Sequence, residues 1–220
     1  MKIILFLISL LSLTSCIELL DDITINSDGS GTFKYSINLS SSKAKVNSII
    51  ALDSIDGKKV PDISEIQQKI LDFKINLSKQ PGIKNVVVEY NFTDYIFKMN
   101  CEFDNVKNLQ IGLQKAFEIT SGQVTSNQND WLIWSNNKLE RNIPTITVER
   151  FKSSKWLDTQ LLSSGTYTSI SRFDKEIESF TNAISKVSKT KKAIMTQVKT
   201  DELFNNTQLL KNKILLEGSK

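Results

Sequence analysis

Histidine is absent from this sequence. A chain without imidazole cannot build a Ser-His-Asp triad, a Cys-His pair or a metal site with histidine ligands, because each of them needs that side chain. Histidine is also the side chain that changes charge near neutral pH, so a histidine-based pH switch is excluded. The function classes that remain are binding proteins, scaffolding proteins and enzymes that use other acids and bases.

Arginine is nearly as scarce. The three arginines are Arg141, Arg150 and Arg172, and the other basic residues are lysines. Recognition of phosphates and nucleotide bases relies on the planar guanidinium group, and the formal net charge is only +4. The composition therefore predicts no nucleic-acid partner. No cluster of side chains has the spacing of a metal or cofactor site, so none is predicted.

The N-terminal apolar run is too short to span a bilayer, which takes about 20 residues. It covers residues 3–13, is broken only by Ser9 and Ser12, and follows Lys2. A charged start and an apolar segment of about 7–15 residues are typical of a secretory signal peptide. Four residues complete the segment: Leu13, Thr14, Ser15 and Cys16.

An aliphatic residue, two small residues and a cysteine resemble the lipobox of bacterial lipoprotein precursors. The resemblance implies cleavage between Ser15 and Cys16, which removes residues 1–15 as a signal peptide. It also implies a diacylglycerol thioether on the Cys16 sulfur, with palmitate or a similar fatty acid on the new amine. One acyl chain gives only marginal membrane binding, whereas two or three hold a soluble domain firmly. The alternative is an ordinary signal peptide that ends near a cysteine.

The same resemblance implies a location in the cell envelope. In the proteobacterial sorting rule, an aspartate after the lipidated cysteine retains the protein in the inner membrane, and Ile17 stands there instead. We therefore expect a lipid anchor in the outer membrane, with the domain facing the periplasm or the cell surface. Residues 16–22 are expected to form the acylated anchor and a short tether, and residues 23–220 a single domain.

Acidic residues soon after the anchor resemble the surface-export signals of lipoproteins of the Bacteroidota. Asp21 and Asp22 supply them here, further from Cys16 than in that pattern. The Asp-Gly-Ser-Gly turn at residues 28–31, following a lipobox, is similar to uncharacterised envelope lipoproteins of the same phylum. This similarity implies no activity.

Alternating apolar residues predict a β-hairpin over residues 23–40, with its turn at residues 27–31. Apolar residues at three- and four-residue spacing predict helices. These helices cover residues 41–55, 62–77 and 106–117. Gly57 is expected to close the first helix, and Asp62 with Glu65 resembles a capping box at the start of the second.

The strongest strand signal is a central hairpin. With Thr93–Asp94 as a two-residue loop, four pairs face one another: Phe92–Tyr95, Tyr90–Phe97, Val88–Met99 and Val86–Cys101. A slip of one residue would turn one strand's apolar set to solvent, so burial is expected to fix this register. We expect Phe97 and Met99 to be buried and the alternate residues Lys98 and Asn100 to be more exposed.

Strand patterns dominate after residue 130. They cover residues 131–135, 145–151, 166–173, 192–198 and 211–216. Short helices are predicted over residues 156–162 and 201–204, and the polar segment 122–129 is the one candidate boundary within the domain. Together the elements predict an α+β fold, in which two or three helices pack on one face of an antiparallel sheet.

Two features could carry chemistry, and each has a structural alternative. Asn26, Asp28 and Ser30 imitate the first half of a calcium-binding EF-hand loop, but Ile37 stands where the acidic ligand belongs. Cys101 lies among aromatic residues on one strand face, where burial raises the pKa of a thiol. We predict a hairpin turn at the first feature and a buried structural cysteine at the second.

No catalytic residue can be named, because no carboxylate, lysine or hydroxyl group has diagnostic spacing. We therefore expect a membrane-anchored envelope lipoprotein that binds or scaffolds another envelope protein without catalysis. One alternative is a carrier of a hydrophobic or lipid ligand, with a cavity lined by the hairpin's aromatic face: Tyr90, Phe92, Tyr95, Phe97 and Phe103. The other is a histidine-independent hydrolase that pairs a buried lysine with serine or aspartate.

Overall fold

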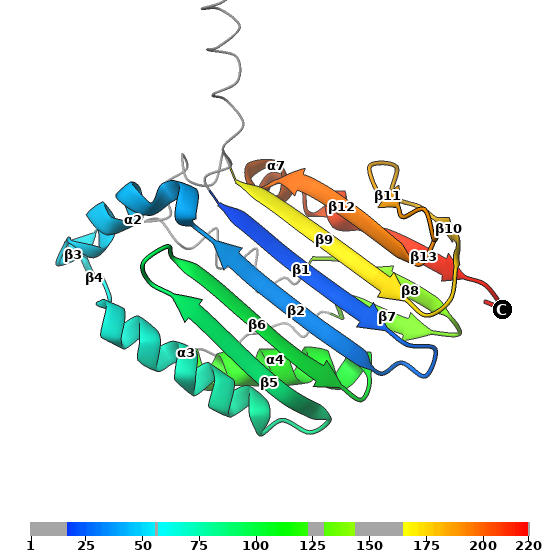
Figure 1. The fold of residues 1–220 in the computed structure, drawn as a ribbon, viewed down its shortest axis with the longest axis horizontal. Coiled ribbons are helices and arrows are strands. Elements are labelled where there is room, and N and C mark those ends of the chain that lie inside the picture. Colours follow the sequence, from blue (N-terminus) through cyan, green and yellow to red (C-terminus); the bar gives the residue numbers. More distant parts are fainter. Residues whose placement is uncertain (1–16, 56, 123–129, 144–164, 220) are drawn as a thin grey trace, which may run out of the picture.

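The computed structural model describes residues 17–55, 57–122, 130–143 and 165–219. These residues form an α+β fold of mainly antiparallel strands with helices packed on one face, as the sequence predicts. Figure 1 shows the larger of its sheets from the open side, with two long helices and a smaller sheet behind it.

The central hairpin of the large sheet consists of β1 (Glu18–Ile25) and β2 (Gly31–Asn38), which pair antiparallel. β1 also pairs in parallel with β9 (Thr166–Phe173) over its whole length. The other neighbours in this sheet are antiparallel. The order of the seven strands is β11 (Lys186–Val187), β12 (Ala193–Lys199), β9, β1, β2, β6 (Ile96–Phe103) and β5 (Ile83–Asn91).

Two different layers cover the back of this sheet (Figure 1). The helices α3 (Ile63–Ser78) and α4 (Val106–Ser121) pack side by side behind β5 and β6. A four-stranded antiparallel sheet lies behind β9 and β12. Its order is β10 (Ile177–Phe180), β13 (Asn212–Leu216), β8 (Lys138–Arg141) and β7 (Leu132–Ser135).

Short elements lie around the ends of the large sheet. After β2 the chain forms the 3-10 turn η1 and the helix α2, and after β12 it forms the helix α7 and the 3-10 turn η2. A two-stranded ribbon joins α2 to α3. The bounds of these elements are Ser40–Ser42 (η1), Lys43–Ile50 (α2), Ser54–Ile55 (β3), Lys58–Lys59 (β4), Thr200–Asn205 (α7) and Thr207–Leu210 (η2).

The ends of the long helices are fixed by local hydrogen bonds. Asp62 Oδ1 accepts from the Glu65 backbone N–H at 2.8 Å, and Glu65 Oε2 accepts from the Asp62 N–H at 3.1 Å, which confirms the capping box. α4 ends at Ser121 and is capped by Gly122, whose φ of +67° suits a residue without Cβ. Within α4, Gly112 lets β5 approach closely, since a Cβ there would lie 2.9 Å from Ile83 Cγ1.

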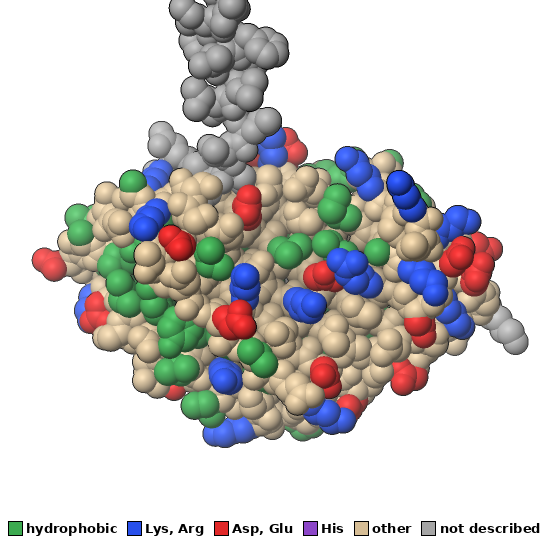
Figure 2. All heavy atoms as spheres, viewed as in Figure 1, with side chains coloured by type: hydrophobic (Ala, Val, Ile, Leu, Met, Phe, Trp, Pro, Cys, Tyr) green, Lys and Arg blue, Asp and Glu red, His purple; other side chains and the backbone are tan. Residues whose placement is uncertain are grey.

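One face of the large sheet is buried and the other is open. Along β1 the side chains at positions 19, 21, 23 and 25 are buried, whereas those at positions 20, 22 and 24 are half-exposed. Figure 2 shows acidic and basic side chains scattered over the open face, with hydrophobic side chains gathered mainly toward the α2 and β5 side. This is the pattern of an antiparallel sheet with one solvated face.

The hairpin predicted over residues 86–103 is β5–β6, and it has the predicted register in its middle. Tyr90 pairs with Phe97 and Val88 with Met99, and Met99 is 4% exposed while Lys98 is exposed. Phe97 is only half-buried at the margin of the core.

Two features of that hairpin were predicted wrongly. β5 ends at Asn91 and β6 begins at Ile96, so the loop has four residues instead of two. The Asn91 side chain accepts hydrogen bonds from the Thr93 and Asp94 N–H groups, and Tyr95 takes a φ of +53°, and both features stabilise this longer loop. Phe92 and Tyr95 therefore belong to the loop instead of forming a strand pair. A register shift between Lys84 and Val87 also removes the expected pair of Val86 with Cys101.

Other boundaries also differ from the prediction. α2 ends at Ile50, and Gly57 lies beyond it between β3 and β4 with a φ of +75°. β8 was missed; it follows a turn at Asn136 and Asn137, whose φ values of 50° and 58° are typical of a tight hairpin. β10 and β11 were also missed. The predicted strand 145–151, the predicted helix 156–162 and the boundary 122–129 apart from Gly122 lie outside the described residues.

Candidate functional site

The predicted acylation site lies immediately before the described part of the chain. Ser15 and Cys16 are outside the described residues, and Ile17 is the first within them. Ile17 is 3% exposed, and its carbonyl accepts a hydrogen bond from the Thr166 N–H at 2.7 Å. The chain is thus fixed against β9 at the residue that follows the predicted acylation site.

The segment expected as a tether is part of the fold. β1 begins at Glu18, where the sequence predicted a strand only from Ile23, so residues 18–22 belong to the central strand of the large sheet. The prediction failed because the Asp21–Asp22 pair interrupts an otherwise apolar alternation. Burial of Asp21 at 1% exposure also means that its carboxylate is not available as an export signal in the folded domain.

A small apolar cluster surrounds this start of β1. Ile17 and Leu19 pack with Tyr167 of β9, Val198 of β12 and Leu203 of α7. The remaining buried members are Ile143 and Leu210. The cluster is separate from the main core and ties the first residues of the domain to β9, β12 and α7.

Asp21 is the centre of a buried polar cluster between the two sheets. Arg141 Nη2 on β8 donates to Asp21 Oδ1 and Oδ2, both at 2.6 Å. The Tyr167 hydroxyl on β9 also donates to Asp21 Oδ2. Arg141 is 3% exposed, and its Cζ lies 5.6 Å from the centroid of the Trp131 ring. Residues 120 positions apart in sequence are therefore joined by a buried ion pair that links β1 to the second sheet.

The electrostatics of the cluster follow from its burial. Desolvation raises the pKa of the Asp21 carboxyl, while the Arg141 charge and the Tyr167 hydrogen bond oppose that rise. Desolvation and the Asp21 charge raise the pKa of the Tyr167 hydroxyl, so it stays protonated and donates. Burial likewise raises the pKa of Tyr35, which pairs with Asp21 across β1 and β2.

The cluster is suited to structure rather than to chemistry on a substrate. Asp21 and Arg141 are almost fully buried, and among the described residues no hydrogen-bond partner meets Arg141 Nε or Nη1. The π face of the Trp131 ring offsets part of the cost of burying the Arg141 charge. Buried ion pairs of this kind select one arrangement of elements while adding little net stability.

The turn at Asp28 is a hairpin turn, as predicted. Asp28 Oδ1 accepts from the Ser30 N–H at 2.9 Å and from its hydroxyl at 2.7 Å, and these bonds lower the pKa of the Asp28 carboxyl. Asp174 Oδ2 accepts from the Ser27 N–H and hydroxyl at 2.9 and 2.7 Å, which fastens the turn to the end of β9. Within the described ranges no group of three or more potential metal ligands comes together.

Cys101 is a buried structural cysteine, as predicted. It is 2% exposed on the inner face of β6, and burial raises the pKa of its thiol to about 12. The thiolate that would act as a nucleophile is therefore not formed near neutral pH.

A shallow groove lies at the start of α3. It is open to solvent, and Lys59 on its rim donates to Glu65 Oε1 at 2.6 Å. Its lining is mainly polar and charged: Lys59, Pro61, Glu65, Gln68, Lys69, Asp72 and Thr120. Such a lining does not resemble the apolar chamber that a lipid carrier needs.

The hydrolase alternative required a buried lysine beside serine or aspartate. Among the side chains whose burial the structure describes, every lysine is exposed or half-exposed. The described residues therefore do not supply the pair on which that alternative depends.

Sequence reasoning missed the residues that the fold places together most tightly. Asp21, Arg141 and Tyr167 come from three distant segments, and nothing in one sequence pairs them. The available signal was the rarity of arginine, since two of the three arginines pair with the adjacent aspartates: Arg141 with Asp21 and Arg172 with Asp22.

No family model matches this sequence, and no curated protein matches it. Among solved structures, the chain is similar to the folded domain of the Mycobacterium tuberculosis protein LppM, determined by NMR. The two share 13% sequence identity over 93% of this chain and 91% of that chain, with a TM-score of 0.43. At that score the likeness supports no inference about function. None of the helices in the described part of the chain is both long and apolar enough to cross a membrane.

Proposed function

We propose that this protein is a lipoprotein of the cell envelope whose folded domain binds or scaffolds another envelope protein without catalysing a reaction. The observation that carries the proposal is the N-terminal motif, in which Lys2 and the apolar residues 3–13 lead to Leu13, Thr14, Ser15 and Cys16. Two or three acyl chains on Cys16 give a lasting hold on the bilayer, which a single chain does not.

The location of the start of the fold supports this proposal. β1 begins at Glu18, directly after the proposed acylated residue and Ile17. A chain cleaved before Cys16 keeps every described residue of the domain. Ile17, in place of aspartate, favours the outer membrane as the destination.

A binding role is supported by the chemistry of the described surface. The charged groups deepest in the fold, Asp21 and Arg141, already pair with each other. The open face of the large sheet instead presents exposed charges of both signs, among them Lys34, Lys98, Glu89 and Glu102. A polar face with alternating charges suits a protein partner with complementary charges.

The proposal is tested by growing cells with a labelled fatty acid and comparing the wild type with Cys16→Ser. The wild-type protein should carry the label and fractionate with membranes. Cys16→Ser should lose the label and accumulate as an uncut precursor, because the acceptor sulfur is missing. The matched control is Ser15→Ala, which keeps a small residue before the cysteine and should still be labelled.

A Cys16→Ser protein that remains cleaved, labelled and membrane-bound would show that the lipid is attached elsewhere or that the anchor is of another kind. An unlabelled wild type in the soluble fraction would favour the ordinary signal peptide.

A further inference from the structure

We infer that the end of the domain formed by α2, the β5–β6 loop and α7 lies directly against the lipid bilayer. This end is called the anchored end. The inference deepens the proposed function and rests on it, because it takes Cys16 as the acylated residue. It adds that the domain has one orientation on the membrane, with β1 running away from the lipid surface.

The first step is that no flexible linker separates the proposed anchor, Cys16, from the first residue that packs in the sheet. Ile17 is 3% exposed and its carbonyl is bonded to the Thr166 N–H, while Glu18 already pairs with Asn38 and with Thr166. Consecutive Cα atoms are about 3.8 Å apart, so Cys16 is held within one residue of a fixed strand. A domain attached in this way cannot swing on a tether.

The second step is the set of elements that share this end. The strand registers place Lys199, Thr166, Glu18, Asn38 and Ile96 in one row across the sheet. α7 follows Lys199, η1 and α2 follow Asn38, and the β5–β6 loop precedes Ile96. Figure 1 shows α2 and α7 on either side of the start of β1. Of the described elements, these lie closest to any bilayer that holds residue 16.

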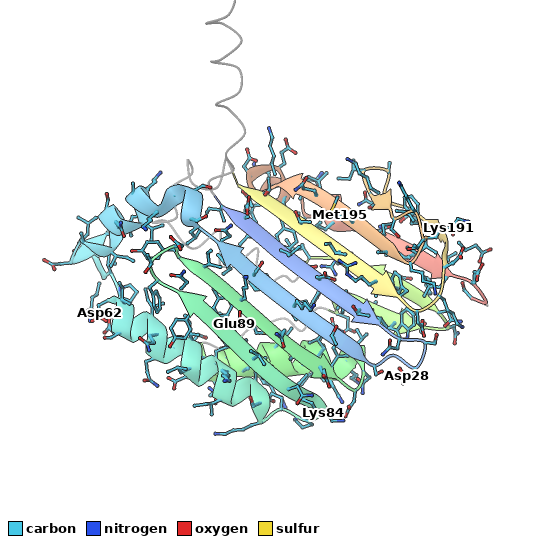
Figure 3. The ribbon with its side chains drawn as sticks, in the orientation of Figure 1. Asp28, Asp62, Lys84, Glu89, Lys191 and Met195 are labelled. Atoms are coloured by element: carbon cyan, nitrogen blue, oxygen red, sulfur yellow. The ribbon has the colours of Figure 1, made fainter. Side chains whose placement is uncertain are left out.

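The third step is the opposite end, which must face away from the lipid. Ile83, Phe103, Gly31, Ile25 and Phe173 form the last row that β5, β6, β2, β1 and β9 share. Figure 3 places Lys84 and Asp28 at this end, far from α2 and α7. A strand of the length of β1, eight residues, separates the two ends by about 26 Å.

Charge does not explain the orientation, so the anchor must set it. At the anchored end Lys43 lies 3.6 Å from Asp94, and Lys199 is followed by Asp201 and Glu202. Charges of both signs give little attraction to anionic lipid, which is drawn to clusters of basic residues. The domain without acyl chains should therefore not bind vesicles, and the acylated protein should stay bound at high salt.

The orientation is tested with purified acylated protein in vesicles of phosphatidylethanolamine and phosphatidylglycerol that contain a nitroxide on a lipid headgroup. A fluorophore is attached at Ala44→Cys in α2 or, as the matched variant, at Lys84→Cys; both positions are exposed. The thioether blocks Cys16, and burial protects Cys101 from labelling. Circular dichroism confirms that each variant is folded.

The nitroxide should quench the Ala44→Cys label several-fold more strongly than the Lys84→Cys label. Insertion of a ten-residue Gly-Ser linker between Cys16 and Ile17 should abolish most of that difference, since the domain then rotates freely. Equal quenching at both positions in the uninserted protein, or stronger quenching at Lys84→Cys, would overturn the orientation while leaving the lipid anchor intact. A purified chain without acyl chains would instead refute the proposed function, and this inference with it.

Discussion

The buried face of the large sheet is closed by two kinds of chemistry. Behind β5 and β6, the contacts of α3 and α4 are apolar, as at Leu77, Met99 and Leu109. Behind β9 and β12 the contacts of the second sheet include a layer of buried polar groups. Its members are Asp21, Arg141, Ser169, Ser171, Ser185, Thr196 and Asn212. One half is held by area removed from water, and the other by apolar contacts together with specific polar pairing.

The polar half is connected by hydrogen bonds from sheet to sheet. Asn212 Nδ2 on β13 donates to Ser185 Oγ at 3.2 Å, and the Ser185 and Thr196 hydroxyls lie 2.7 Å apart, which reaches β12. Asn212 Oδ1 accepts from the Thr181 and Asn182 N–H groups at 3.1 Å. Such networks specify which strands meet, because any other arrangement would leave buried groups unpaired. The comparison predicts that the two halves respond differently to mutation.

The largest expected effect is loss of Arg141. Arg141→Met leaves the Asp21 carboxylate buried without its cation, which should lower the free energy of unfolding by about 3–5 kcal/mol. The double variant Asp21→Leu/Arg141→Met removes both charges and should recover most of that loss. Urea unfolding of the two variants measures both quantities. A double variant no more stable than Arg141→Met would show that the pair is not the source of the effect.

The pH dependence of the stability of Arg141→Met tests whether an unpaired Asp21 carboxylate causes the loss. Desolvation already raises the folded-state pKa of Asp21 above its unfolded value, and loss of the opposing Arg141 charge raises that pKa further, so the folded state binds the proton more tightly. Stability should then fall as the pH rises from the unfolded pKa toward the folded one, and acidification should restore part of the loss. A loss independent of pH in that window would contradict an unpaired carboxylate as its cause.

In the helix-covered half, stability should depend on the volume of the buried apolar side chains and not on polar pairing. Leu109→Ala in α4 removes a side chain that is 0% exposed, and we expect a loss of about 2–5 kcal/mol with no pH dependence. Ile119→Ala, at 61% exposure on the same helix, is the control and should change stability by less than about 0.5 kcal/mol. Similar losses for both variants, measured by chemical unfolding, would mean that α4 is not packed as described.

A smaller effect is expected at the start of α3. Asp62→Ala removes the acceptor for the Glu65 N–H and should cost about 0.5–2 kcal/mol, whereas Asp62→Asn retains a capping oxygen and should cost less. Thermal unfolding of the two variants compares them. If the alanine and asparagine variants unfold at the same temperature, the side-chain cap at residue 62 does not contribute to the stability of the helix-covered half.

The smallest effect is expected at the second Arg–Asp pair. Arg172 and Asp22 form hydrogen bonds of 2.9–3.1 Å on the open face, with the Arg172 side chain 48% exposed. Arg172→Ala should cost only about 0.2–1 kcal/mol, and less at high salt, because water screens the pair. A loss as large as that of Arg141→Met would erase the distinction between the buried and the open face of β1.

The same division explains what could be predicted from the sequence. α3 was predicted closely, because apolar periodicity reports directly on a face that packs by area. The predicted start of β1 was five residues too late, at Ile23 instead of Glu18, because an aspartate such as Asp21 is expected at the surface and not in a buried strand position. β8 was missed because Leu139 is its one apolar residue and the burial of Arg141 depends on a partner 120 positions away. Rules about neighbouring residues predict helix caps, turns and short motifs. They do not predict which polar residues pair across long sequence distances, because that depends on the three-dimensional fold.

The proposed attachment of this sheet to a membrane through Cys16 is tested most directly by the mass of the N-terminal peptide of the protein purified from cell envelopes. We expect a peptide that begins at Cys16 and carries a diacylglycerol thioether, followed by the residues that enter β1. A peptide that begins at another residue, or an unmodified Cys16 in the membrane-bound protein, would contradict it.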